Sequence, residues 1–276
     1  MNKYKNKRLF VLVAAAIFMG LIFYNSFEFY NKKNIAQNTT NNIKDMLPKP
    51  ATNAIMNERE SKVNSKGIPN DLSSIDVYKP NGHKIAYLTF DDGPSPKITP
   101  SILKILDNYN IKATFFLIGS MAIKNPDIVR SEVKDGQSIG NHTYSHDYKY
   151  IYSNANNFIT DINKCDATLK SIIGNGYTSK LLRFPGGSFG NKRIELRESI
   201  KVAGYHYFDW NDLTGDSEQK NVPVNKLLTN LKKNTKGKEH VVILMHDAGD
   251  KETTVEALPM VVEYLKSEGY SFSTLS

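Results

Sequence analysis

The chain has 276 residues, of which 40% are hydrophobic and 23% are charged, and its formal net charge is +8. Residues 1–79 hold 12 Lys and Arg against 6 Asp and Glu, so most of the positive excess lies near the N-terminus. The remaining residues are almost neutral, which argues against a nucleic-acid-binding domain, because such a domain gathers basic residues on one face.

The first 30 residues have the pattern of a membrane anchor. Four basic residues, ending at Arg8, precede an uncharged apolar run over residues 9–24. Basic residues before an apolar segment keep the N-terminus in the cytoplasm and direct the rest of the chain outward. A helix that continues through residues 25–27 is long enough to cross the bilayer. We predict a single-pass anchor over residues 1–30, with a cleaved signal peptide and a secreted protein as the alternative.

Residues 31–80 are rich in Asn, Lys, Ser and Thr and contain several prolines, which predicts a disordered polar spacer. The composition then changes, and we expect a single catalytic domain over residues 81–276. Cys165 is the only cysteine, so the domain has no internal disulfide and depends on its core for stability.

Apolar β-rich runs alternate with stretches of helical spacing from Lys84 onward, which predicts a parallel sheet. Seven strands over about 190 residues favour an incomplete barrel over a full eightfold one. The predicted strands are Ile85–Phe90, Ala113–Ile118, Ser138–Asn141, Leu181–Phe184, His206–Trp210, Val241–Met245 and Ser271–Thr274.

Polar clusters follow the ends of four of these strands. They contain Asp91 and Asp92, then residues 141–146, then Arg183, then residues 246–247. The carboxyl ends of parallel strands meet on one face, where active sites lie. Four clusters at four strand ends therefore predict an active site there.

Two histidines, His142 and His146, have the spacing that places both rings on one side of a helical turn. With a carboxylate from another strand end they make three ligands, which leaves the open position of a catalytic zinc site. Taken alone, the histidines are equally explained as surface or capping residues, and Asp91 and Asp92 as a helix cap. Their joint occurrence at strand ends favours the metal.

Four motifs together resemble the polysaccharide deacetylases of carbohydrate esterase family four, the NodB-homology domain. The resemblance extends from Lys84 to Leu275 and implies a distorted (β/α)7 barrel that removes acetyl groups from sugars. It also implies zinc or another divalent ion, such as Co, Mn or Ni, as cofactor. The motifs are Thr-Phe-Asp-Asp at 89–92, His-x-x-x-His at 142–146, Arg-x-Pro-x-Gly at 183–187 and Leu-x-His at 244–246.

The resemblance further implies a role for each matching residue. Asp92, His142 and His146 correspond to the metal ligands. Asp91 corresponds to the general base that activates water, and His246 to the general acid that protonates the leaving amine.

The supporting roles follow from the same resemblance. Arg183 corresponds to the residue that orients Asp91, and Asp216 to the one that tunes His246. The N–H of Gly186 corresponds to the oxyanion donor, and Leu244 to part of the pocket for the acetyl methyl group.

Two positions depart from the family pattern, which often has an aromatic residue at Gly186 and usually has Trp at Ser217. Both departures concern the substrate groove rather than the chemistry. Asp209 and Asp212 have no role in the pattern, and we interpret them as solvated loop carboxylates.

Two rival hypotheses come from other classes. Residues 186–190 match the Gly-x-Ser-x-Gly elbow of serine α/β-hydrolases, and Ser188, Asp216 and His246 follow their chain order. This hypothesis leaves the two-histidine motif without a role. A non-catalytic wall-binding module is the other rival, and the presence of all the metal and acid–base residues argues against it.

The substrate prediction rests on the expected location. An exported chain without disulfides resembles wall-facing enzymes of Gram-positive bacteria, so we predict peptidoglycan N-acetylglucosamine as the substrate. O-acetylated xylan, chitin and poly-N-acetylglucosamine are alternatives. We expect a monomer whose partners are cell-wall polysaccharide and, through the N-terminal helix, the membrane, with no nucleic acid.

Overall fold

The computed structural model describes residues 77–276. The predicted anchor over residues 1–30 and nearly all of the predicted spacer lie outside the described residues. Within residues 77–276, no helix has the length and apolar character needed to cross a membrane.

The sheet is built from parallel strands in the order β5-β4-β3-β2-β1-β7-β6, and β8 pairs with the first residues of β1. Within the described part of the chain, β5 and β6 pair only with β4 and β7, so the sheet curls without closing. This arrangement confirms the predicted incomplete barrel. The strands are β1 (Ile85–Asp91), β2 (Thr114–Leu117), β3 (Ser138–Asn141), β4 (Leu181–Leu182), β5 (His206–Tyr207), β6 (Asp212–Leu213), β7 (His240–His246) and β8 (Ser271–Phe272).

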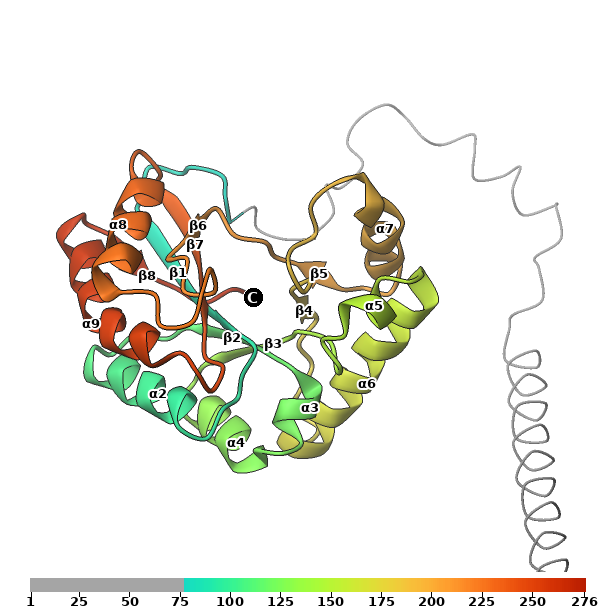
Figure 1. The fold of residues 1–276 in the computed structure, drawn as a ribbon. Coiled ribbons are helices and arrows are strands. Elements are labelled where there is room, and N and C mark those ends of the chain that lie inside the picture. Colours follow the sequence, from blue (N-terminus) through green and yellow to red (C-terminus); the bar gives the residue numbers. More distant parts are fainter. Residues whose placement is uncertain (1–76) are drawn as a thin grey trace, which may run out of the picture. The chain divides into compact units, whose positions relative to one another are not determined.

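The helices lie around the outside of the curled sheet (Figure 1). Each longer helix turns an apolar stripe toward the strands, as α2 does with Ile98, Ile102 and Leu106. The helices are α2 (Ile98–Asn108), α3 (Gly119–Ala122), α4 (Pro126–Lys134), α5 (Tyr148–Ile151), α6 (Ala155–Ile173), α7 (Ile194–Val202), α8 (Val224–Thr235) and α9 (Glu252–Ser267), with a 3₁₀ turn, η2, at Asn191–Arg193.

Strand β1 shows how the sheet directs one set of side chains to the core and another to the site. Successive side chains of a strand point to opposite faces. Leu88 and Phe90 belong to the main core with α2 and α9, whereas Tyr87, Thr89 and Asp91 point to the other face. Asp91 therefore ends β1 on the inner side of the curled sheet, although it is only 3% exposed.

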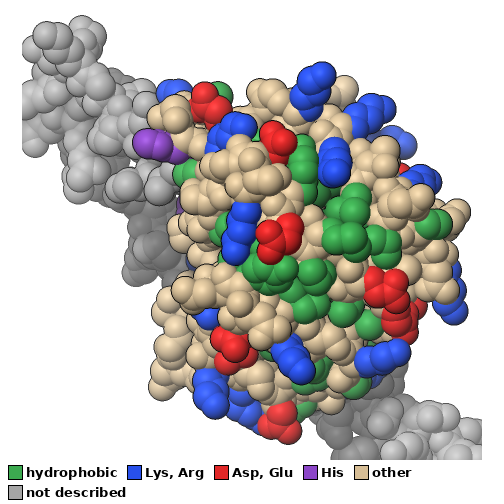
Figure 2. Space-filling model, turned by 90° about the vertical axis from the view of Figure 1, so that its left-hand side faces the viewer, with side chains coloured by type: hydrophobic (Ala, Val, Ile, Leu, Met, Phe, Trp, Pro, Cys, Tyr) green, Lys and Arg blue, Asp and Glu red, His purple; other side chains and the backbone are tan. Residues whose placement is uncertain are grey.

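The surface that carries α8 and α9 mixes both signs of charge around a group of apolar side chains (Figure 2). Met260 of α9 is among the exposed apolar side chains of this part of the chain. Basic and acidic residues alternate on this face, so it carries no continuous basic stripe (Figure 2).

Strand β6 differs from the prediction. The sequence predicted one strand over residues 206–210, but β5 ends at Tyr207 and a further two-residue strand follows at Asp212. Asp212 is 1% exposed and accepts a hydrogen bond from the Thr235 hydroxyl at 2.5 Å. Its burial raises its pKa to about 6. The interpretation of Asp212 as a solvated loop carboxylate was therefore wrong.

Candidate metal-dependent active site

The four predicted polar clusters meet at the carboxyl ends of the strands. Asp91 and His246 are direct partners in the register of β1 and β7. Asn141 at the end of β3 pairs with Leu182 of β4, which places the histidine motif beside Arg183. The convergence that the sequence predicted is confirmed.

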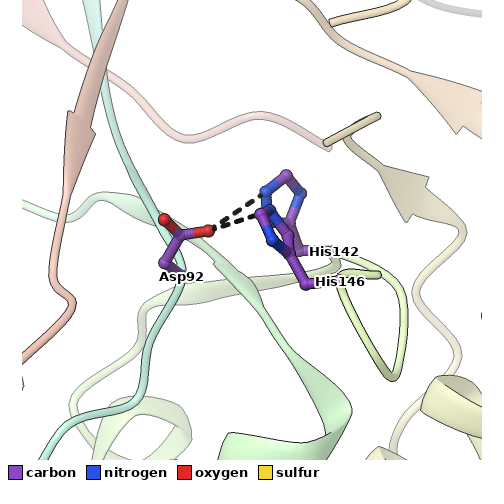
Figure 3. Close-up of side chains that lie close together, drawn as sticks. All are labelled: Asp92, His142 and His146. Carbon is purple, nitrogen blue, oxygen red and sulfur yellow. Dashed lines mark ion pairs between the residues drawn. The ribbon is translucent and has the colours of Figure 1, made fainter. Parts of the chain in front are cut away.

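Asp92, His142 and His146 form a cluster of potential metal ligands. One Asp92 oxygen, Oδ1, lies 3.4 Å from Nε2 of His142 and 3.3 Å from Nε2 of His146, as Figure 3 shows. One ligand atom from each residue lies within 4.8 Å of the others. The His142 side chain is 3% exposed, whereas those of Asp92 and His146 are 26% and 25% exposed, so the cluster opens to solvent on one side.

The two histidines do not lie on a helical turn, contrary to the prediction. Thr143 and His146 both have positive φ, at 66° and 53°, so the segment is an irregular loop. The carboxylate of Asp161 on α6 accepts the N–H groups of Tyr144 and Ser145 at 2.6 and 2.9 Å. These bonds fix the loop in a shape that brings both rings to Asp92. The sequence spacing was informative, but the helical geometry assigned to it was wrong.

The cluster has the properties of a divalent-metal site. Asp92 Oδ1 is buried and has no hydrogen-bond partner among the described residues. The Nδ1–H of His142 donates to the carbonyl of Arg183 at 2.9 Å, so in the neutral ring Nε2, which faces Asp92, is the nitrogen that can bind a metal. Tetrahedral ligands about 2.1 Å from zinc are about 3.4 Å apart, close to both Asp–His distances. The three residues therefore fit a zinc-sized ion.

Asp92 is held in its ionised form. Burial alone raises the pKa of its carboxyl, but the His142 ring 3.4 Å away and the charges of His246 and His146 outweigh this and lower the pKa well below its usual range. An ionised carboxylate with a free oxygen is what a cation needs as a ligand.

Asp91 lies next to the cluster and is held by a buried arginine. Arg183 is fully buried, and its Nη1 donates to Asp91 Oδ1 at 2.9 Å and to the Thr89 hydroxyl at 2.6 Å. The other Asp91 oxygen lies 3.8 Å from Nε2 of His142. Asp91 is thus oriented by the guanidinium while one oxygen faces the cluster.

His246 is hydrogen-bonded to the buried carboxylate of Asp216. Nδ1 of His246 is 2.8 Å from Asp216 Oδ1, and Asp216 Oδ2 accepts the His246 backbone N–H and the Thr254 hydroxyl, each at 2.8 Å. Burial alone lowers the pKa of His246. The hydrogen bond and charge of Asp216 and the charges of Asp91 and Asp92 outweigh it and raise the pKa to about 9.

The predicted oxyanion and pocket residues border this region. Gly186 has φ of 72°, which favours glycine because a side chain there is strained. Leu244 is two residues before His246 on β7 and shares its face of the strand. It is 8% exposed, so it contributes an apolar surface beside the histidine.

Ser188 does not form the serine triad of the rival hypothesis. Its hydroxyl donates to Asp209 Oδ2 at 2.5 Å, and its N–H donates to Asp209 Oδ1 at 2.9 Å. Asp216 is bonded to His246, as a triad would require, but the Ser188 hydroxyl donates to Asp209, so the three residues do not form a relay. Asp209 closes a loop rather than lying free in solvent, which also corrects its interpretation as a solvated carboxylate.

Asp247 is a buried residue that the motif analysis left without a role. It is fully buried, its N–H donates to the Asp91 carbonyl at 3.0 Å, and its Oδ2 accepts the Thr99 hydroxyl at 2.5 Å. A Cβ on Gly93 would stand 2.1 Å from this carboxylate, so the loop after Asp92 packs directly against it. The sequence could have indicated that Asp247 lies near the site, because it directly follows His246.

Comparison with known proteins agrees with this geometry. Residues 78–208 match the family model described as polysaccharide deacetylase. A peptidoglycan-N-acetylglucosamine deacetylase of Bacillus cereus is 35% identical over 198 residues, which cover 71% of this chain and 89% of that protein.

Solved structures give the same result. A Streptococcus mutans esterase of carbohydrate esterase family four has a TM-score of 0.66 and 31% identity, covering 71% of this chain and 87% of that one. The catalytic domain of a peptidoglycan N-acetylglucosamine deacetylase from Eubacterium rectale has a TM-score of 0.65 and 31% identity, covering 72% and 91%. The chain therefore belongs to the polysaccharide deacetylases of carbohydrate esterase family four. It is an enzyme of that class rather than a non-catalytic wall-binding module.

The Asp216 carboxylate is expected to control the proton affinity of His246. In Asp216→Asn the negative charge is lost, so the pKa of His246 should fall from about 9 by about 1 to 3. The pKa of His246 is measured by an NMR titration of its imidazole in metal-depleted protein. Asp250→Asn removes an exposed carboxylate nearby and should leave the value unchanged. An unaltered pKa in Asp216→Asn would show that Asp216 does not tune the ring.

Proposed function

We propose that the chain is a metal-dependent deacetylase that removes N-acetyl groups from N-acetylglucosamine in peptidoglycan. The observation that carries this proposal is the arrangement of Asp92, His142 and His146, with Asp91 and His246 next to it. The named activity of the Bacillus cereus and Eubacterium rectale relatives supports the substrate class.

Asp92, His142 and His146 would hold the ion. Two imidazoles and one carboxylate are ligands that suit zinc, and Co, Mn or Ni also accept such a set. When bound, the ion would act as a Lewis acid that polarises the acetyl carbonyl and makes water more acidic.

Asp91 and His246 would divide the proton transfers between them. Asp91, oriented by Arg183, would take the proton from the attacking water. His246 would give a proton to the amine nitrogen, which cannot leave as an anion. The hydrogen bond from His246 Nδ1 to the Asp216 carboxylate favours the protonated ring, which is the form that an acid needs.

The remaining predicted residues would bind the acetyl group. The backbone N–H of Gly186 would donate to the oxyanion as the carbonyl becomes tetrahedral. Leu244 would contact the methyl group, for which its apolar surface beside His246 is suited.

We further propose that residues 1–30 hold the enzyme at the outer face of the cell membrane, with residues 31–80 as a spacer. The basic residues that end at Arg8 and the apolar run over residues 9–24 support this location. A wall polymer would then be the substrate within reach.

Removing either histidine of the cluster should remove the ion. His142→Ala and His146→Ala should each lose stoichiometric zinc and lower kcat/KM by at least about 100-fold, because two remaining ligands hold the ion weakly. Zinc content is measured by mass spectrometry and folding by circular dichroism. His83→Ala, an exposed histidine outside the site, is the control. Full zinc and turnover in both variants would refute the ligand assignment.

Asp91 and His246 should affect two substrates differently. Asp91→Asn should lower kcat/KM by about 10² to 10⁴ on both an N-acetylglucosamine oligomer and an aryl acetate, because both need the attacking water. His246→Ala should lower kcat/KM by a similar factor on the oligomer. It should lower kcat/KM much less on the aryl acetate, whose phenolate leaves without a proton. Both variants should keep their zinc. Equal losses on the two substrates in His246→Ala would contradict its role as the acid.

The location can be tested on the full chain expressed in a Gram-positive host. Cell fractionation should recover the protein with membranes, and N-terminal sequencing should begin at or next to Met1, because an uncleaved apolar helix remains in the bilayer. Recovery only in the medium, with the first 30 residues removed, would show that they form a cleaved signal peptide.

A further inference from the structure

Tyr148 lies at the open edge of the metal cluster and has no part in the chemistry described above. It is the first residue of α5, and its side chain is exposed, with 48% of the residue accessible. Its ring packs edge-on against His146, with 5.3 Å between the ring centres. Since His146 is the most exposed histidine of the cluster, Tyr148 borders the side from which a substrate must approach.

The Tyr148 ring is held in place although its outer surface is exposed. Tyr152 packs against it at 5.7 Å, also edge-on, and the Tyr152 hydroxyl donates to the carbonyl of Pro185 at 2.6 Å. Tyr152 is in turn packed against Phe158 of the core. A ring fixed in this way loses little conformational entropy when a ligand binds.

Gly186 leaves room for the Tyr148 side chain. A Cβ added at Gly186 would stand 2.9 Å from the Tyr148 hydroxyl and 3.1 Å from the nearest ring carbon. Tyr148 therefore fills the space beside residue 186, the position at which the family pattern often has an aromatic residue. The aromatic surface is present, but it comes from α5 instead of the loop after β4.

The Tyr148 hydroxyl is available to a ligand. Within residues 77–276 it has no hydrogen-bond partner, in contrast to the hydroxyl of Tyr152. It lies close to Gly186, whose N–H is the proposed oxyanion donor. Tyrosine combines an apolar ring with a polar tip, which matches a sugar that has C–H groups on its faces and hydroxyls at its edge.

We propose that Tyr148 is a specificity residue that forms one wall of the sugar-binding groove. It would contact the N-acetylglucosamine unit that carries the reacting acetyl group, with its ring against the sugar and its hydroxyl bonded to a sugar oxygen. The inference rests on the proposed function and adds a residue that recognises the polysaccharide rather than the acetyl group.

The wall can be tested by comparing a polymeric substrate with a small one. Tyr148→Ala should raise KM for an N-acetylglucosamine pentamer by about 30-fold, as expected for loss of an aromatic contact that the bound sugar covers. Tyr148→Phe should raise it by about 3- to 10-fold, the value of one hydrogen bond. Both should hydrolyse an aryl acetate like the wild type, because that substrate has no sugar to contact.

Tyr150→Ala is the matched control, since Tyr150 lies on the same short helix and is 39% exposed. It should leave KM for the pentamer unchanged. Zinc content and melting temperature are measured for all variants. If Tyr148→Ala lost zinc and reduced both activities equally, Tyr148 would only support His146 and the proposal would be wrong. An unchanged KM for the pentamer would also overturn it.

A binding measurement can test the role of Tyr148 independently of the proposed deacetylase activity. Calorimetry with the pentamer and zinc-depleted protein needs no turnover, so it tests the wall even if the wild type proves inactive. Weaker binding by Tyr148→Ala than by Tyr150→Ala would support the wall whether or not deacetylation occurs. Equal binding by the two variants, or no binding by the wild type, would overturn it.

Discussion

The geometry of the site depends on one buried guanidinium. Arg183 is fully buried, and a buried charge without partners is strongly destabilising. Its partners are Asp91, the Thr89 hydroxyl and the carbonyls of Phe208 and Asp209. These groups belong to β1 and to the segment after β5, so one side chain joins two separate parts of the curled sheet. Lysine cannot replace it, because an ammonium lacks the planar fork that reaches four acceptors.

Arg183 also connects Asp91 to the cluster of Asp92, His142 and His146. Its carbonyl accepts the Nδ1–H of His142, and its guanidinium holds Asp91. The inner half of the site is thus fixed by buried bonds. The outer half is accessible, since Asp92, His146 and Tyr148 all retain exposed surface. A rigid interior that faces an open edge is suited to a polymer, which must bind without being enclosed.

Much of the fold and the site could be predicted because it follows from local pattern. The alternation of strands and helices has a clear period, and clusters at parallel strand ends must converge. The conformation of residues 142–146 could not be predicted, because it is set by Asp161 on a later helix. Strand β6 has only two residues and leaves no periodic signal. Asp212 looked solvated because its partner, Thr235, lies 23 residues further along the chain.

The pairing of β1 with β7 has a consequence for how the protein folds. These central strands pair over seven residues, Ile85 with His240 at one end and Asp91 with His246 at the other. The pairing joins the start of the domain to a segment about 155 residues later, so a long loop must close before the centre of the sheet exists. Contacts between residues this far apart in the sequence slow folding, and the apolar strands stay exposed until they pair. Because a ribosome makes the chain from its N-terminus, β1 must wait for its partner until His246, near the C-terminal end of the domain, has been synthesised.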